Sequence, residues 1–494
     1  MTSQNDKTKR PLISLIFVSF FSVSGGSYGS EVVIPVIGVK NFTYLQIAVC
    51  VFYAVPLILI YDLMYRSFPG NSGPKSWCRE MLGPFSGHFV DILYIFMELG
   101  MLSSFVGISS AYVNSFLGSM KNELFSQESQ IIISLSIFAF IIAISISLSQ
   151  FEDYTKFMFI IVIFPLLVLV TFTFTKIPMS SWFSLNKLEP EKVDWIVGLQ
   201  YVMWLNCGYE NLFSRSSIKK GIGATNDNTK LKLPLILSVV LVSFTYIIPL
   251  WCGCCILNYF NKDHSSYELG NFFTLSGSLL GGNLLSSLIT ISAFISSIGC
   301  ITIDVDSVSK YIISKWLKTH NSQYQNTYFS QETTVSLGVV VLCSILTLFV
   351  DQQHFAAGAS TLYGFITLII IISFLKFIWT LHIKDEFSNI KSESYLPLTQ
   401  TEIRKIDQTV CHKPYTQTNN DLLYFGNVSL KSKQILHSVL AVPITLFVLV
   451  VFFTSSSIPY MLVIFFTFIF SYVSFYFGES SIHNYDKTKI NVMK

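Results

Sequence analysis

The chain has 494 residues, of which 51% are hydrophobic and 12% are charged, and its mean hydropathy is +0.56. This composition excludes an ordinary soluble domain and indicates a polytopic membrane protein. The net charge of +3 is too small to indicate nucleic-acid binding, and no GxxxxGK[ST] phosphate loop is present to support ATP-driven pumping.

Twelve apolar stretches of a length that can cross a bilayer follow one another along the sequence. They are 11–38 (interrupted), 43–65, 88–112, 129–149, 155–175, 195–214, 233–258, 283–303, 333–350, 359–383, 435–453 and 458–478. With a cytoplasmic N-terminus, six lysines face outward and the other 26 of the 32 Lys and Arg residues face the cytoplasm. This asymmetry obeys the positive-inside rule, so we expect both termini to be cytoplasmic.

The predicted spans divide the chain into two sets of five and a peripheral pair. We expect a cytoplasmic tail over 1–10, a first five-helix repeat over 11–175 and a second over 195–383. A polar cytoplasmic loop, predicted to be largely disordered, covers 384–434, followed by two peripheral helices over 435–478 and a tail over 479–494.

The first span is interrupted by VSGGSYGSE at 23–31, which places three glycines and Glu31 inside an apolar helix. Each glycine costs a helix about 1 kcal/mol, and a charged side chain costs roughly 2.5–3.5 kcal/mol at the centre of a bilayer. One interpretation is that Gly25 and Gly29 form a helix-packing motif of small residues. That interpretation does not account for Glu31.

The sixth span is interrupted in the same way by WLNCGYE at 204–210, where Asn206, Gly208 and Glu210 break an apolar run. Paired interruptions at matching positions of two halves are typical of inverted-repeat transporters. In such proteins the substrate lies near the bilayer midplane, against unwound backbone.

Acidic residues outnumber basic ones within the predicted spans, and they are Glu31, Asp62, Asp91, Glu98, Glu210 and Asp304. Carboxylates in a bilayer indicate an ion pathway, a proton relay or a cationic ligand. Asp62 and Asp91 lie near cytoplasmic ends, so we expect them to be solvated. For Glu98 a relay and a structural hydrogen bond are both open.

No cofactor or metal is expected. The nine cysteines lie mostly in apolar runs without the ligand spacing of a zinc site, so we interpret them as packing residues. No nucleophile–base arrangement occurs within the spans, and the sequence therefore does not predict an enzyme.

Four segments together resemble the amino acid–polyamine–organocation superfamily. VSGGSYGSE is similar to VSGGPFGVE of the polyamine uptake transporters of plants and protists, and FPGNSG with LGPFSG is similar to their second-to-third helix loop. SSIGCITID at 296–304 resembles their eighth helix, and LYGFITLIIIISFLK at 362–376 resembles their tenth.

The resemblance implies an all-α membrane protein with about 12 transmembrane helices, a LeuT-like 5+5 inverted repeat, and broken helices 1 and 6. It also implies secondary active transport of amino acids or polyamines by alternating access, coupled to protons and independent of sodium. Two departures leave the substrate open. Ile370 stands where the polyamine group carries a glutamate, and the sixth span is equally similar to the FAYGGWN pattern of neutral amino-acid exchangers.

The resemblance also assigns site residues. Backbone N–H groups at Gly25, Gly26, Ser27 and Gly29 would hold a carboxylate, and Trp204 would form an aromatic gate, with core packing as its alternative. Asn206, Gly208 and Glu210 complete the expected substrate site. The coupling candidates are Glu31, Glu98, Lys156, Ser297 and Asp304. Lys156 would take the place of a sodium ion, or would be an ordinary positive-inside anchor.

The expected partners are a small-molecule substrate, protons and the lipid bilayer, without nucleic acid and with the oligomeric state left open. The plasma membrane is the expected location, with a vacuolar or other internal membrane as the alternative. A transporter-like nutrient sensor, which binds substrate without net flux, is the alternative function.

Overall fold

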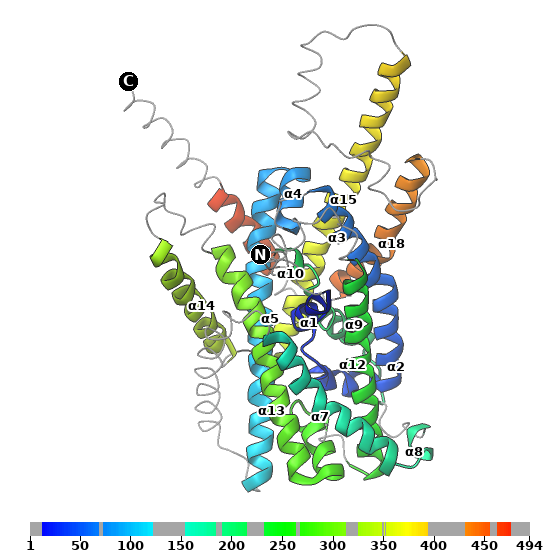
Figure 1. Ribbon diagram of the computed structural model, residues 1–494, viewed down its shortest axis with the longest axis vertical. Coiled ribbons are helices and arrows are strands. Elements are labelled where there is room, and N and C mark those ends of the chain that lie inside the picture. The colour runs from blue at the N-terminus through cyan, green and yellow to red at the C-terminus, as the bar shows by residue number, and fades with distance from the viewer. Residues whose placement is uncertain are drawn as a thin grey trace, which may run out of the picture.

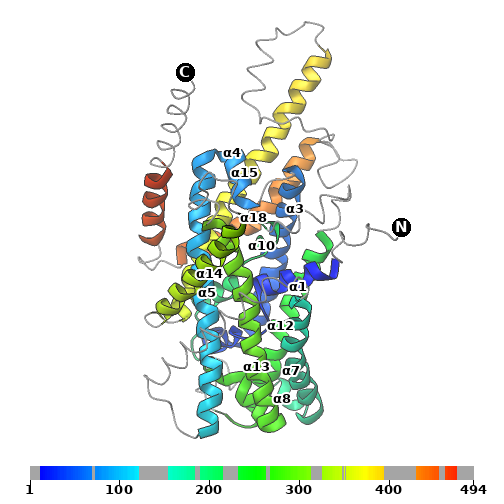
Figure 2. The same cartoon turned by 60° about the vertical axis from the view of Figure 1, so that its left-hand side comes forward.

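The computed structural model describes residues 12–68, 73–121, 154–183, 190–214, 232–262, 267–312, 325–347, 350, 352–393, 430–454 and 462–475. All the regular secondary structure in these residues is helical. Figures 1 and 2 show an elongated bundle in which α5 (Pro84–Lys121) and α13 (Asn271–Ile312) run side by side along its length. These two helices form the frame against which the shorter elements pack.

The other elements follow in chain order. They are α1 (Leu12–Val23), η1 (Ser30–Val33), α2 (Ile34–Val49), η2 (Cys50–Ala54), α3 (Val55–Ser67), α4 (Pro74–Leu82), α7 (Tyr154–Lys176), α8 (Ser180–Phe183), α9 (Trp195–Trp204), α10 (Asn211–Ser214), α12 (Lys232–Tyr259), α14 (Gln325–Thr347), α15 (Gln352–Glu393), α18 (Leu430–Thr454) and a final helix over Leu462–Phe475.

Six helical runs of the described residues are long and apolar enough to cross a membrane. They are Ser30–Ser67, Pro84–Gly118, Thr155–Lys176, Leu233–Tyr259, Asn271–Ser309 and Gln352–Thr380. Shorter apolar helices cover Thr334–Thr347, Ser438–Val450 and Leu462–Phe475. The predicted span at 129–149 lies outside the described residues, so the count of twelve stays a prediction.

Both predicted helix breaks are present. α1 ends at Val23, and the chain is not helical again until Ser30, because Gly25, Gly26 and Gly29 adopt φ values of 66°, 118° and 91°. In the sixth span α9 ends at Trp204 and α10 begins at Asn211, with Gly208 at φ 104°. These positive φ angles suit glycine and strain other residues.

Helix ends differ from the predicted boundaries at two further glycines. Gly38, at φ 76° and ψ 159°, separates the outer part of the first span from the second span, and Gly282, at φ 65°, kinks α13. α15 continues to Glu393, inside the loop predicted over 384–434. α18 likewise begins at Leu430, inside that predicted loop, whereas 394–429 lie outside the described residues.

Asp62 and Asp91 are buried, which corrects the expectation that they are solvated. Asp62 forms an ion pair with Arg66 at 3.0 Å, one helical turn away on α3, and Asp91 on α5 forms one with Lys75 of α4 at 3.6 Å. The burial of a charged group is tolerated when a partner of opposite charge is supplied. These two carboxylates therefore anchor the end of the bundle at α3 and α4 (Figure 1).

Candidate substrate site

The two helix breaks contact each other directly. Ser22 Oγ, at the end of α1, donates a hydrogen bond to the carbonyl oxygen of Gly208 at 2.9 Å. A Cβ atom on residue 208 would collide with the backbone oxygen of Ser22, so glycine is the residue that allows this approach. The end of α1, at the first break, therefore meets the unwound backbone of the second break at one place in the bundle.

Hydrogen bonds within the protein engage the N–H groups of the three glycines in the first break. Gly25 N donates to the carbonyl of Phe20 at 3.2 Å, Gly26 N to the Ser24 hydroxyl at 3.0 Å, and Gly29 N to the Glu31 carboxylate at 2.8 Å. The intervening N–H groups of Ser27 and Tyr28 donate to no described acceptor. In this structure the glycine N–H groups have acceptors within the protein, and the carboxylate site at these backbone groups stays a prediction.

Neighbouring helices fix the carbonyl side of the same break. The Ser296 hydroxyl of α13 donates to the Gly25 carbonyl at 2.5 Å, and the Ser27 hydroxyl donates to the Thr245 carbonyl of α12. A Cβ on Gly25 would lie 2.5 Å from Cys300 Sγ. The first break is therefore packed tightly against α13.

Trp204 covers the outer part of the first break. A Cβ on Gly29 would lie 3.5 Å from Trp204 Cη2, and the Trp204 ring centroid is 6.3 Å from that of Phe105 on α5. Trp204 is 2% exposed, and its indole N–H has no hydrogen-bond partner among the described residues. A buried donor of this kind is costly unless a ligand or water accepts from it.

Glu210 lies just beyond the second break, and it is 1% exposed. Its Oε2 atom accepts a hydrogen bond from the Tyr363 hydroxyl of α15 at 2.7 Å. No basic side chain of the described residues forms an ion pair with it. Glu98 of α5 accepts a hydrogen bond from Asn211 Nδ2 at 3.0 Å, so a second carboxylate contacts the residue that follows Glu210.

The Glu31 carboxylate accepts hydrogen bonds from three different segments of the chain. The donors are the Tyr112 hydroxyl at 2.6 Å, the Gly270 N–H at 3.2 Å and the Gly29 N–H at 2.8 Å. Gly270 precedes α13, and a Cβ on it would lie 2.5 Å from the backbone of Ala111. The Glu31 carboxylate thus joins the first break to α5 and to the start of α13.

Asn206 is occupied by protein contacts. Its Nδ2 donates to Gln46 Oε1 at 3.0 Å and to the Val202 carbonyl at 2.8 Å, and its Oδ1 accepts from Gln46 Nε2 at 3.2 Å. Both polar atoms are therefore satisfied by the α2 and α9 helices. In this structure Asn206 forms a reciprocal amide pair between the second and sixth spans, and its contact with a substrate stays a prediction.

The remaining coupling candidates are distributed along α7 and α13. Lys156 is half-buried at the start of α7, a helix that packs against α1 and α13. The Ser297 hydroxyl donates within its own helix to Ala293 O at 3.2 Å, whereas the adjacent Ser296 reaches the first break. Asp304 is buried two turns further along α13. The hydroxyl of Ser297 therefore bonds within α13, and that of Ser296 bonds to the first break.

Four contact residues were not predicted from the sequence, and they are Gln46, Tyr112, Ser296 and Tyr363. A single polar or aromatic residue in an apolar span forms no repeating pattern in the sequence. Only the structure, which shows its neighbours, can therefore identify it as a contact residue of the site. Tyr363 and Ser296 do lie inside the segments that resemble the superfamily. Which of Ser296 and Ser297 reaches the first break depends on how α13 is rotated about its axis, and the sequence does not give this rotation.

The bundle is apolar and helical, and its two glycine breaks meet beside buried carboxylates. These features are typical of secondary transporters with broken helices. The fold is similar to that of a Na⁺-coupled sialic acid symporter solved in a substrate-bound outward-open state. The TM-score is 0.54 at 13% sequence identity, with 74% of this chain and 79% of the symporter covered. At this identity the likeness describes the fold alone.

Residues 12–475 match the amino acid permease family, and the chain belongs to this family. The match places it in the amino acid–polyamine–organocation superfamily, as its motifs indicate. No curated protein matches the sequence. The chain is accordingly an integral membrane protein and a secondary transporter rather than an enzyme.

Proposed function

We propose that the protein carries amino acids or polyamines across the membrane by alternating access, coupled to protons and independent of sodium. Glu210 carries this proposal, because it is a buried carboxylate at the second break and has no basic partner in the described residues. An ionised carboxylate is expensive in a bilayer unless a cation or proton neutralises it. A cationic substrate group or a transported proton would supply that neutralisation.

The substrate would lie between the two breaks. A cationic group of the substrate would contact Glu210, and for arginine or lysine this is the side-chain cation. A carboxylate, where the substrate has one, would accept from the N–H groups of Ser27 and Tyr28. The unpartnered indole N–H of Trp204 provides a further donor over the same break. This arrangement supports compounds with at least one amino group, and it favours a cationic substrate slightly over a neutral one.

Ile370 argues against a long polyamine. It is fully buried on α15, two turns beyond Tyr363, at the position where the resemblance leads one to expect a second acid. A diamine held at both ends needs two carboxylates, whereas arginine or lysine needs one at its side chain. We therefore rank cationic amino acids ahead of polyamines as substrates.

Uptake into proteoliposomes of the full-length protein tests the proposal. Radiolabelled arginine, leucine and putrescine would be compared with and without an inward proton gradient, in sodium and in choline buffer. We expect saturable arginine uptake that a protonophore abolishes and that sodium does not change. Saturable binding without flux of any of the three compounds would support a sensor instead, and would contradict transport.

A further inference from the structure

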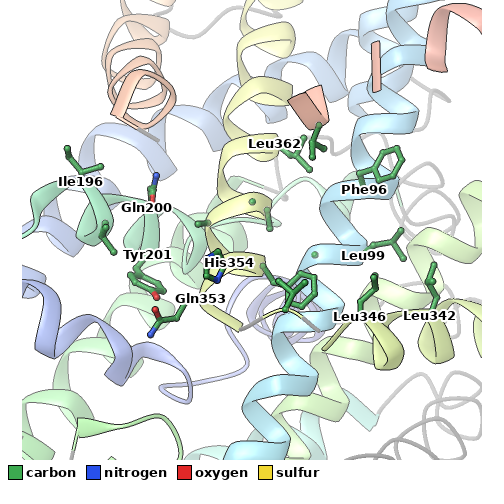
Figure 3. Close-up of a pocket in the computed structure, with 18 residues that line it drawn as sticks. Phe96, Leu99, Ile196, Gln200, Tyr201, Leu342, Leu346, Gln353, His354 and Leu362 are labelled. Carbon is green, nitrogen blue, oxygen red and sulfur yellow. The ribbon is translucent and has the colours of Figure 1, made fainter. Parts of the chain in front are cut away.

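A cavity of about 950 Å³ lies away from the helix breaks, between α5, α9, α14 and α15 (Figure 3). None of its lining residues belongs to either break, so it is separate from the proposed substrate site. Small residues leave the space, namely Gly100 on α5 and Ala357, Gly358 and Ala359 on α15. Its size is within the range of pockets that bind small organic ligands.

The cavity is accessible from the bilayer. Phe96, Ile196, Leu342 and Val463 line it and are between 40% and 46% exposed, although they lie on apolar helices. In a membrane protein such side chains face lipid. A molecule dissolved in the hydrocarbon can therefore reach the cavity without crossing water.

Polar and apolar side chains line different parts of the cavity. Gln200, Tyr201, Gln353 and His354 gather along α9 and the first turn of α15, whereas the facing walls on α5 and α14 are apolar (Figure 3). Among the described residues the lining includes no Lys, Arg, Asp or Glu. This division fits an amphiphile with an uncharged, hydrogen-bonding head, and the described lining residues offer no counter-charge for a phosphate headgroup.

We propose that this cavity is a binding site for a sterol-type lipid of the surrounding membrane. The sterol hydroxyl hydrogen-bonds to Gln353 and His354, and the ring system fills the apolar space between α5 and α14. α9 is the first half of the broken sixth span, so a bound sterol packs against an element that alternating access must move. This last consequence depends on the proposed function, whereas the binding itself does not.

Photolabelling of the full-length protein in phosphatidylcholine proteoliposomes tests the site, with a photoreactive cholesterol analogue as the probe. We expect mass spectrometry to locate the adducts on α9, α14 and α15, and excess cholesterol to compete them away. Ala357→Phe fills the cavity and should abolish these adducts, and Leu346→Trp does the same from α14. Gln353→Leu removes one head contact and should weaken labelling by about fivefold, the equivalent of one hydrogen bond.

Ile372→Phe is the matched control, because it enlarges a residue on α15 that is 55% exposed and lies outside the cavity lining. It should leave the labelling unchanged. Adducts spread over the lipid-facing helices and unaffected by both filling variants would overturn the proposal. Labelling does not require transport, so this result stands apart from the uptake assay.

Discussion

The hydroxyl of Ser22 and the carbonyl oxygen of Gly208 are joined by a 2.9 Å hydrogen bond across 186 positions of the sequence. Ser22 belongs to α1, and Gly208 lies between the two halves of the sixth span. One bond therefore connects the last turn of α1, just before the first break, to the unwound part of the sixth span. Moving one break without the other would break this bond, and the following predictions test the residues around the two breaks.

Gly29→Val should abolish transport, and Gly26→Val should do the same. Residue 29 has φ 91°, and its new Cβ would lie 2.6 Å from Ile108 Cδ1, while residue 26 has φ 118°. A residue other than glycine at a positive φ costs about 1–2 kcal/mol. We expect the protein to fold at this cost, with the first break displaced. Gly338→Val in α14 is the control, since nothing lies within 4 Å of a Cβ at that position. Normal uptake by both break variants would exclude this segment from the site.

Glu210→Gln should reduce uptake of cationic substrates by well over tenfold, since loss of one partner of a buried charge pair costs about 2–5 kcal/mol. If the carboxylate instead carries the coupling proton, the glutamine variant should exchange substrate but fail to accumulate it. Measuring exchange and accumulation in the same vesicles separates these outcomes. Tyr363→Phe should give a smaller defect of the same kind, because it removes only the hydrogen bond to Oε2. Full accumulation of every substrate would leave Glu210 with a structural role.

Tyr112→Phe should weaken the contact between the first break and α5 while leaving the ring packing intact. The hydroxyl donates to Glu31 at 2.6 Å, and a hydrogen bond to a charged group contributes about 1.5–3 kcal/mol. We expect faster hydrogen exchange over residues 24–31 and 267–273, measured by mass spectrometry. Tyr44→Phe, at a side chain that is 72% exposed, provides the control. Unchanged exchange in Tyr112→Phe would show that Glu31 does not depend on this contact.

Gln46→Ala and Asn206→Ala should each destabilise the protein, because each leaves the side-chain carbonyl oxygen of the partner buried without its hydrogen bond, at a cost of about 1–3 kcal/mol. The double variant should cost less than the sum of the single variants, since both remove the same reciprocal pair. Thermal unfolding of the four proteins in detergent measures this coupling. Strict additivity would contradict the pairing.

Uptake should be equal in sodium and in choline buffers, with Lys156 acting as a fixed cation on α7 beside α1 and α13. Lys156→Ala should then lose transport, while Lys156→Arg should retain part of it because the charge is preserved. Lys376→Ala tests whether any lysine near the inner ends of the spans has the same effect. A steep dependence of uptake on sodium would refute this role for Lys156.

The helix breaks could be predicted from the sequence because glycine and acidic residues are rare in apolar helices, and Gly29 and Glu31 stand out without any structural information. The burial of Asp62 could not be predicted, because in the sequence its partner Arg66 is indistinguishable from any basic residue at the cytoplasmic end of a span. Their ion pair becomes visible only in the folded structure. The hydrogen-bonded pair of Gln46 and Asn206 could not be predicted from the sequence either. Its two members lie 160 positions apart, and no local pattern connects them.

The same limit explains why the contacts of the site residues could be predicted only in part. The glycines predicted the position of each break, but the direction of each N–H group depends on φ and ψ angles that composition does not encode. The bond from the Gly26 N–H group to Ser24 is an example, and the contact of Gly26 with a ligand stays a prediction. The cavity beside α9 depends on how α5, α14, α15 and the final helix pack around it, and sequence periodicity carries no information on the space left between helices.

The buried cysteine thiols at the two breaks offer a chemical measure of motion, because an alkylating reagent reacts with them only when they become exposed. Cys300 Sγ is packed against Gly25, and Cys207 is fully buried in the second break. All eight cysteines of the described residues are buried, so an alkylating reagent can reach these two only when the helices around the breaks part. With Cys411, which lies outside the described residues, replaced by serine, alkylation rates at positions 300 and 207 would time the opening of each break in an otherwise native chain.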